Sequence, residues 1–302
     1  MKIHSTFEEH QTYLKDNLPT DFEVIDDKQK AQWLITGTFK PEDYHPDLKG
    51  VIVPFSGTDR IDQKTIEKHD LKLFNTTVHA IYVAEMAVKL TLGVLGQINT
   101  KDQKLAQGDW SGIRSKQPRE PWITLIDKNV GIFGFGQIGR NIKHLLSSFT
   151  KHFYTIDRGK DYEDCLLVDD LETLVEKSDV VIISAPLSPT TKHSFNEAIL
   201  NKMHNKYLIN VGRGDIIEEA ALYQALKTKT LKGFAADVWF HYPKATNQVR
   251  LPSQYPIHRF DNVLMSPHCG GFSEKAPDVM KKNVLDRLLA LKKGDYTGQL
   301  KR

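Results

Sequence analysis

Cysteine is scarce in this chain, which has two, Cys165 and Cys269, among its 302 residues. Two cysteines cannot build the disulfide framework that stabilises many small secreted proteins. The opening stretch, MKIHSTFEEHQ, also lacks the apolar core of a signal peptide. The sequence therefore predicts a reducing, cytoplasmic setting.

An excess of one charge is also lacking. The 41 basic and 38 acidic side chains leave a formal net charge of +3, and no block rich in lysine or arginine is present. Proteins that bind nucleic acid or acidic membranes usually carry such a block, so we expect neither partner. Histidine, cysteine and carboxylates do not recur at metal-ligand spacing either, and no metal site is predicted.

Long apolar runs are missing too. The longest apolar stretch, residues 79–98, is interrupted by Glu85 and Lys89, whereas a membrane span needs about 20 mostly apolar residues. This stretch is typical of a buried helix. A chain of this length is then expected to form about two globular domains, each with its own core.

Short apolar runs alternate with helical patterns on both sides of this helix. Continuous apolar runs between helices indicate parallel strands that are covered on both faces. We predict helices at 7–18 and 62–69, and strands at 22–26, 32–37, 50–55, 71–75, 129–136, 152–157, 179–186, 207–212, 233–239 and 262–268. The polar segment 99–121 is expected to lead into the second domain.

A glycine motif, GFGQIG at 134–139, lies between a predicted strand and a helical pattern. Alone it could be an ordinary glycine-rich turn. In a dinucleotide-binding fold, however, Gly134 would make the turn, Gly136 would admit the pyrophosphate and Gly139 would let helix and strand pack closely. The helix N-terminus would then supply amide donors to the anion.

The next strand supports dinucleotide binding, because it ends in Asp157, eighteen positions after Gly139. A carboxylate is needed there for the hydroxyls of the adenosine ribose. It would repel a 2′-phosphate, so NAD is favoured over NADP. Arg158 tempers this preference, since a guanidinium could partly accommodate the phosphate.

Polar residues follow three later strands. Arg213 stands between two glycines, Asp237 and His241 follow the next strand, and His268 follows the last. Ligands of open parallel sheets gather at the carboxyl ends of strands. Taken singly, Arg213 could be a surface ion pair and His268 an ordinary loop histidine; together they indicate a site.

Seven segments, in this order, resemble the D-isomer-specific 2-hydroxyacid dehydrogenases: VIVPFSGTDRID, FNTTVHAIYVAEMAV, VGIFGFGQIGR, ISAPLSPTTKHSFN, LINVGRGDIIEEAAL, GFAADVW and MSPHCGG. The resemblance implies an α/β fold with a doubly wound, parallel Rossmann-type NAD-binding domain at 99–269. It also implies a smaller flavodoxin-like α/β substrate domain built from both chain ends, 1–98 and 270–302. Members are commonly homodimers through the nucleotide domain.

The resemblance also implies roles for individual residues. Arg213 would grip the carboxylate of a small 2-oxo or 2-hydroxy acid, since a guanidinium offers paired donors in a fixed plane. His268 would be the general acid/base. Backbone amides of Ser56 and Gly57 would also bind the carboxylate. The residues expected to bind the cofactor are Gly134, Gly136, Gln137, Ile138, Gly139, Asp157, Ala185, Pro186, Val211 and Asp237.

One position departs from the family pattern. Most members have a glutamate a few residues after DVF, paired with the catalytic histidine, and here Tyr242 stands at that spacing. Tyr242 is therefore included among the catalytic residues, while His241 is expected to be packed or peripheral. His79, Trp239 and Tyr242 are the residues we expect to line the substrate pocket.

The sequence thus predicts an NAD-dependent oxidoreductase that works mainly as a 2-oxo acid reductase. Two alternatives stay open. Formate dehydrogenases share this fold and a DVWF stretch, and have a neutral amide where the glutamate is expected, so formate or another small oxyanion is one alternative substrate. The other alternative is a non-enzymatic NAD-sensing protein, because fold does not fix function.

Overall fold

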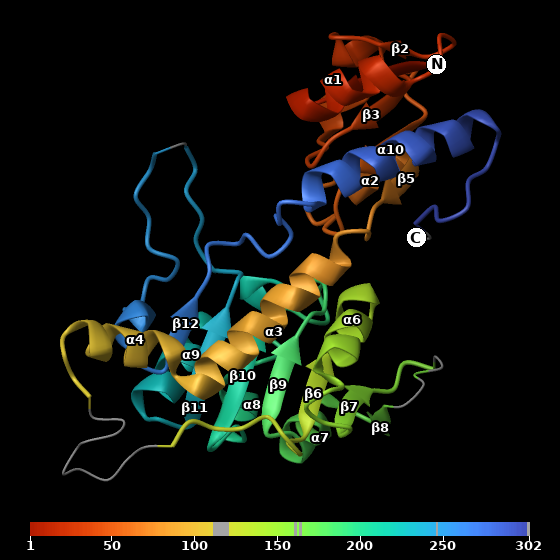
Figure 1. Ribbon diagram of the computed structural model, residues 1–302. Coiled ribbons are helices and arrows are strands. Elements are labelled where there is room, and N and C mark those ends of the chain that lie inside the picture. Colours follow the sequence, from red (N-terminus) through yellow and green to blue (C-terminus); the bar gives the residue numbers. More distant parts are fainter. Residues whose placement is uncertain (111–120, 160–161, 163–164, 246, 301–302) are drawn as a thin grey trace. The chain divides into compact units, whose positions relative to one another are not determined.

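The computed structural model describes residues 1–110, 121–159, 162, 165–245 and 247–300 (Figure 1). The chain forms two compact units: unit 1 comprises Met1–Ala80 and Gly271–Arg302, and unit 2 comprises Ile81–Gly270. Part of the predicted polar link, 111–120, lies outside the described residues. Each unit is an α/β layer structure around its own parallel sheet.

Unit 1 contains a five-stranded parallel sheet in the order β2-β1-β3-β4-β5. The strands are β1 (Lys2–Ser5), β2 (Glu23–Val24), β3 (Trp33–Ile35), β4 (Gly50–Val53) and β5 (Lys72–Asn75). The helices are α1 (Glu8–Asn17), α2 (Gln63–Lys68) and α10 (Ala276–Lys292), with 3-10 turns η1 (Lys28–Lys30) and η2 (Pro41–Asp43).

The C-terminal helix α10 completes the core of unit 1. Its residues Val284, Leu288 and Leu291 are buried in one cluster with Ile3 and Trp33 of the sheet. Burial of apolar side chains is the main stabilising term in folding, so unit 1 depends on both ends of the chain.

Unit 2 contains a seven-stranded parallel sheet in the order β12-β11-β10-β9-β6-β7-β8. Its strands are β6 (Val130–Phe133), β7 (Phe153–Ile156), β8 (Leu166–Val168), β9 (Val180–Ile183), β10 (Lys206–Asn210), β11 (Leu231–Ala236) and β12 (Val263–Met265). Its helices are α3 (Ala80–Gly96), α4 (Ile98–Ala106), α6 (Gln137–Leu146), α7 (Leu171–Lys177), α8 (Glu197–Asn201) and α9 (Glu219–Lys227), with 3-10 turns η3 (Gly214–Ile216) and η4 (Ile257–Arg259).

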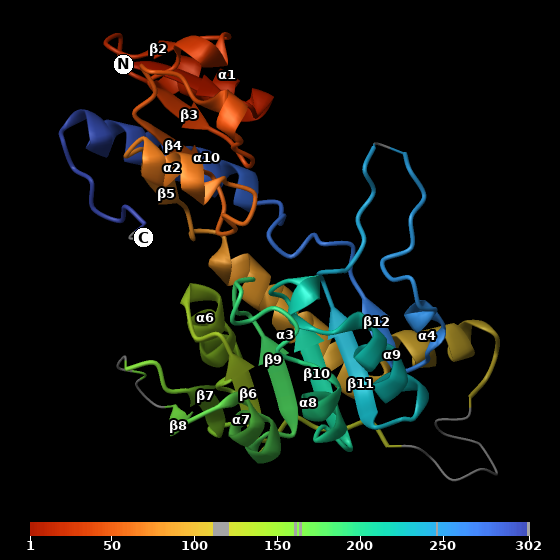
Figure 2. The same cartoon turned by 180° about the vertical axis from the view of Figure 1, so that it is seen from behind.

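Helices cover both faces of the large sheet. Helices α3 and α6 lie over one face (Figure 1), and α7, α8 and α9 lie over the other (Figure 2). The two faces accordingly carry separate apolar clusters, one with residues of α3 and α6 and the other with residues of α7, α8 and α9. Because both faces are buried, the central strand β9 reads as an unbroken apolar run, VVII.

The order of the strands places the glycine motif at the switch point of the sheet. Strand β6 lies between β7 and β9. The chain therefore runs from β6 to β7 on one side of β6, and the later strands, beginning with β9, are added on its other side. Crevices at such points are where open α/β sheets bind ligands.

The predicted fold class is confirmed: both sheets are parallel, and helices alternate with strands. The predicted strand list omitted β1 and β8, which have four and three residues. The polar link also contains a helix, α4. Within the described residues no single helix is long and apolar enough to cross a membrane; only α3 and α4 together, bent by 58°, reach that length and composition.

The boundary between the units differs from the one predicted at residue 98. Helix α3 lies in unit 2, because its residues Ala84, Ala87 and Leu90 are buried with Val130 and Ile132 of β6. The sequence shows that α3 is apolar but not which sheet it covers.

Candidate active site

Gly134 makes the turn that follows β6. Its φ of +100° lies in a region that only glycine adopts readily. A Cβ at this position would also lie 2.5 Å from Cα of Ala185, at the end of the neighbouring strand β9. Gly134 is therefore required both by its conformation and by the close approach of two backbones.

The other two glycines of the motif have different environments. A Cβ on Gly139 would lie 2.5 Å from the carbonyl oxygen of Gly134, so the helix α6 can approach β6 only with glycine here. At Gly136, the N-cap residue of α6, no atom of the described residues other than Gly136 and its two chain neighbours lies within 4 Å of a Cβ position. The helix N-terminus, where Gln137 and Ile138 begin α6, thus has open space beside Gly136, as binding of a pyrophosphate requires.

Asp157 follows β7 and is exposed, as is Arg158. The backbone N–H of Asp157 donates to the carbonyl of Val168 at 2.9 Å, which fixes the position of the residue beside β8. Its Oδ1 accepts a hydrogen bond from the N–H of Gly159 at 2.8 Å. A carboxylate accepts several hydrogen bonds, so Asp157 retains capacity for ribose hydroxyls.

Ala185, Pro186 and Val211 lie at the carboxyl ends of β9 and β10. Ala185 and Val211 are buried, and Pro186 is exposed. The carbonyl of Pro186 accepts a hydrogen bond from Oγ1 of Thr191 at 2.7 Å, and this bond within the loop after β9 stabilises its conformation. These residues can contribute backbone and apolar surface to a cofactor site at this edge.

Arg213 is held between two close backbone contacts. A Cβ on Gly212 would lie 2.6 Å from the carbonyl oxygen of Ala185, and one on Gly214 would collide with the carbonyl of Trp239. The side chain of Asn210 fastens the same turn, because it accepts from the N–H of Gly212 at 3.0 Å and donates to the carbonyl of Arg213 at 2.9 Å.

The guanidinium of Arg213 is positioned by its own backbone. Its Nη1 donates to the carbonyl of Gly212 at 2.8 Å. This hydrogen bond fixes the plane in which the N–H donors of the guanidinium lie, as bidentate recognition of a carboxylate requires.

Asp237 follows β11 and is 3% exposed. Its carboxylate accepts hydrogen bonds from the backbone N–H groups of Cys269 and Gly270, at 2.9 and 2.8 Å. It was predicted as a cofactor contact; what the structure shows is that its carboxylate binds the loop on which His268 stands.

His268 and Tyr242 are brought together. Their ring centroids lie 5.3 Å apart at an interplanar angle of 52°. The Tyr242 hydroxyl also accepts a hydrogen bond from the backbone N–H of Trp239 at 3.0 Å. The position at which the family pattern has a glutamate therefore does face His268, with an aromatic ring.

His241 has another neighbour. Its Nε2 lies 3.6 Å from Oε1 of Glu219, at the start of α9. The same glutamate accepts hydrogen bonds from the hydroxyl of Ser253 and the N–H of Gln254, at 2.7 and 2.8 Å. His241 thus belongs to a group of contacts that fastens the 241–256 loop to α9.

Ser56 and Gly57, in unit 1, follow β4 and are partly buried. The carbonyl of Ser56 accepts a hydrogen bond from Nδ2 of Asn75 at 2.8 Å, and its hydroxyl lies 3.5 Å from Nε2 of His79. Burial lowers the pKa of His79 below its usual value, which favours the neutral imidazole. His79, expected as a pocket residue, therefore lies beside the predicted carboxylate-binding loop.

Three residues that support the site were not predicted as part of it: Asn210, Ser266 and Ser184, whose hydroxyl donates to the carbonyl of Gly134 at 2.6 Å. Asn210 and Ser184 stand at or just after the end of an apolar run, where a small polar residue can bind a neighbouring turn. This position in the sequence is the signal that could have identified them as supporting residues. Ser266 likewise directly follows the apolar run of β12, but its partner Asp237, 29 residues away, could not be read from the sequence.

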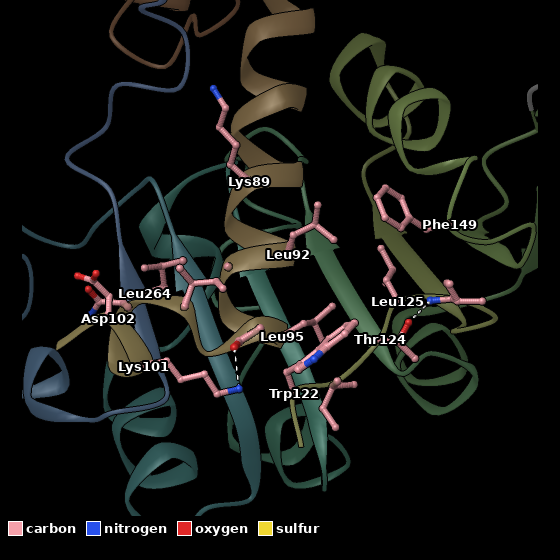
Figure 3. Close-up of a pocket in the computed structure, with 16 residues that line it drawn as sticks. Lys89, Leu92, Leu95, Lys101, Asp102, Trp122, Thr124, Leu125, Phe149 and Leu264 are labelled. Atoms are coloured by element: carbon pink, nitrogen blue, oxygen red, sulfur yellow. Dashed lines mark hydrogen bonds between the residues drawn. The ribbon is translucent and has the colours of Figure 1, made fainter. Parts of the chain in front are cut away.

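A separate hollow of about 920 Å³ lies on the flank of α3 (Figure 3). Trp122 and Thr124, from the segment before β6, lie there beside Leu95 of α3. None of the predicted site residues lines it, and its walls include the segment that enters the amino end of β6. It is therefore not the site that the strand ends form.

The chain is similar to known proteins of one family. A family model, "D-isomer specific 2-hydroxyacid dehydrogenase, NAD binding domain", matches residues 88–270. A glyoxylate reductase from Thermofilum pendens is 34% identical over 284 residues, which cover 90% of this chain and 80% of the relative.

Two solved structures are also similar. One is an NADPH-dependent glyoxylate/hydroxypyruvate reductase from Sinorhizobium meliloti in complex with NADP and malonate, 25% identical with a TM-score of 0.81 over 100% of this chain and 98% of that one. The other is an NAD-dependent formate dehydrogenase from Staphylococcus aureus in complex with NAD, 25% identical with a TM-score of 0.76 over 98% and 96%. The family match covers more than half of the chain, so this protein is an NAD(P)-dependent oxidoreductase that belongs to the D-isomer-specific 2-hydroxyacid dehydrogenase family.

Proposed function

We propose that the protein reduces a small 2-oxo acid to the D-2-hydroxy acid with NADH. The observation that carries this proposal is the fixed orientation of Arg213, which lies between two backbone contacts on the sheet that also carries His268. The glycine turn with open space at Gly136 fits a dinucleotide. When bound, the nicotinamide supplies the hydride.

The residues of the chain supply orientation and a proton. Arg213 binds the carboxylate of the substrate through two N–H donors and so orients the neighbouring carbonyl. As the carbonyl carbon accepts the hydride, the protonated His268 gives its proton to the carbonyl oxygen, so the product is the neutral alcohol of the hydroxy acid.

Tyr242 favours a second candidate, oxidation of formate or another small oxyanion. The ring facing His268 carries no carboxylate, and hydride transfer from formate releases carbon dioxide without moving a proton. A non-enzymatic NAD sensor is the remaining alternative. Retention of both Arg213 and His268 supports an enzyme over a sensor.

The first prediction concerns the reaction. Purified protein should oxidise NADH with one or more of glyoxylate, pyruvate, hydroxypyruvate and bulkier 2-oxo acids, measured by absorbance. Arg213→Lys keeps the charge but loses the paired donors. The transition state should therefore lose about 2 to 4 kcal/mol of stabilisation, seen as a lower kcat/KM, while the affinity for NADH stays nearly unchanged. Exposed Arg259→Lys is the matched control. NAD reduction by formate, with no 2-oxo acid turned over, would instead establish the second candidate.

The second prediction concerns cofactor choice. With its carboxylate on the ribose hydroxyls, Asp157 should make NADH better than NADPH in kcat/KM. Asp157→Ala should narrow this difference by removing both the ribose contact and the repulsion of a 2′-phosphate. Asp169→Ala, which removes an exposed carboxylate after β8, should leave the ratio unchanged. Equal use of NADPH by the natural sequence would contradict the assignment.

The third prediction concerns His268 and its neighbour. His268→Gln should abolish most of the 2-oxo acid reduction. In Tyr242→Glu, a negative charge beside the imidazole ring favours its protonated form, so the alkaline limb of the kcat/KM profile should move to higher pH by about one unit. His241→Ala should leave this limb in place. The pairing is wrong if Tyr242→Glu does not move the limb while His241→Ala disables the enzyme.

We also infer a homodimer that associates through unit 2. The hollow beside α3 is bordered by large apolar side chains that lie open to solvent: Ile98, Trp122 and Ile126 are 62%, 62% and 59% exposed. Contiguous exposed apolar surface of this kind marks association sites.

We also propose a cytoplasmic location, since Cys165 and Cys269 form no disulfide.

The fourth prediction tests this association. Light scattering after size exclusion should give twice the chain mass for the natural protein and the mass of one chain for Ile98→Asp/Trp122→Asp. Val249→Asp is the matched control, because Val249 is an apolar residue 98% exposed on another segment. A natural protein with the mass of one chain would refute the homodimer.

A further inference from the structure

One buried carboxylate holds the loop that carries His268. Asp237 Oδ1 accepts hydrogen bonds from the hydroxyl of Ser266 at 2.6 Å and from the N–H of Cys269 at 2.9 Å. Oδ2 accepts from the N–H of Gly270 at 2.8 Å. These donors stand on both sides of His268 in the sequence, so the carboxylate closes the loop around it.

His268 needs such support, because its backbone is in the left-handed region with φ of +59°. This conformation is unfavourable for a residue other than glycine and persists when the surroundings impose it. Gly270 contributes to the same arrangement: a Cβ there would lie 2.7 Å from Oδ2 of Asp237. Glycine thus lets the amide reach the carboxylate.

A second contact fixes the start of the loop. The indole Nε1 of Trp239 donates to the carbonyl of Ser266 at 2.7 Å, and the N–H of Ser266 donates to the carbonyl of Ala236 at 2.9 Å. The end of β11 and the residues that directly follow it therefore hold both ends of the turn that carries His268.

We propose that Asp237 is a positioning residue that sets the place of His268 and acts on the reaction through it. This inference rests on the proposed function, in which His268 gives the proton. All three partners of the carboxylate are donors, so an acceptor is needed at both oxygens. In Asp237→Asn, the side-chain NH2 group would face one of these donors in place of an acceptor oxygen. The hydrogen bonds on that side of the loop would then be lost.

The fifth prediction tests this role with Asp237→Asn in a Cys165→Ser background. We expect kcat, measured at saturating NADH, to fall by about 10- to 100-fold, the size seen when supporting residues of a site are lost. In His268→Gln, Asp237→Asn should cause no further loss, because residues that act as one unit are not additive. A full further loss would show that Asp237 acts independently of His268.

A second readout needs no activity. Cys269 is partly exposed within the loop, so its alkylation rate by iodoacetamide reports loop opening. Asp237→Asn should raise this rate at least about tenfold. Gly270→Ala keeps the carboxylate but displaces it, and should also raise the rate; it replaces Asp237→Asn if that variant does not fold.

The outcomes separate the possible roles. An unchanged alkylation rate in folded Asp237→Asn and Gly270→Ala would overturn the proposal, as would weakened NADH binding with an unchanged kcat, which would make Asp237 a cofactor contact only. If the natural protein reduces no 2-oxo acid, the proposed function fails, while faster alkylation in these variants still supports the role of Asp237 in holding the loop.

Discussion

Close contact between backbones at one edge of the seven-stranded sheet is the constraint on which the site depends. Gly134 and Gly212 both approach Ala185, and Gly214 approaches Trp239. These contacts connect the turns that follow β6, β9, β10 and β11. A side chain at any of the three glycines would force two strand ends apart, so the turn at the cofactor motif and the turn of Arg213 are set by the same packing.

The sequence predicted those parts of the fold that local pattern determines. Unbroken apolar runs such as VVII of β9 identified buried parallel strands, and the glycine spacing identified the turn after β6. Strand β8 was not predicted, because its apolar run, LLV, is only three residues long. Helix α3 was recognised as buried, but its choice of sheet depends on contacts with β6 that are distant in the sequence.

The candidate site shows the same limit. Single residues such as Arg213 could be selected because they follow strands and match a family pattern. The bonds that hold them could not: Asp237 meets Cys269 and Gly270 across more than thirty residues, and Asn210 meets Arg213 only through the shape of a turn. Tyr242 shows what the sequence can and cannot predict. Its spacing from the strand predicted its place, but only the structure gives the contact of its ring with His268.

Helix α10 has a consequence for the order of events during synthesis. Unit 2 is continuous in the chain, whereas unit 1 needs α10, which is synthesised after unit 2, to cover Ile3 and Trp33. Long-range contacts form late, and domains fold as units while the chain is being made. Unit 2 can therefore fold on the ribosome before α10 is made, while Ile3 and Trp33 stay without the helix that covers them in the folded structure.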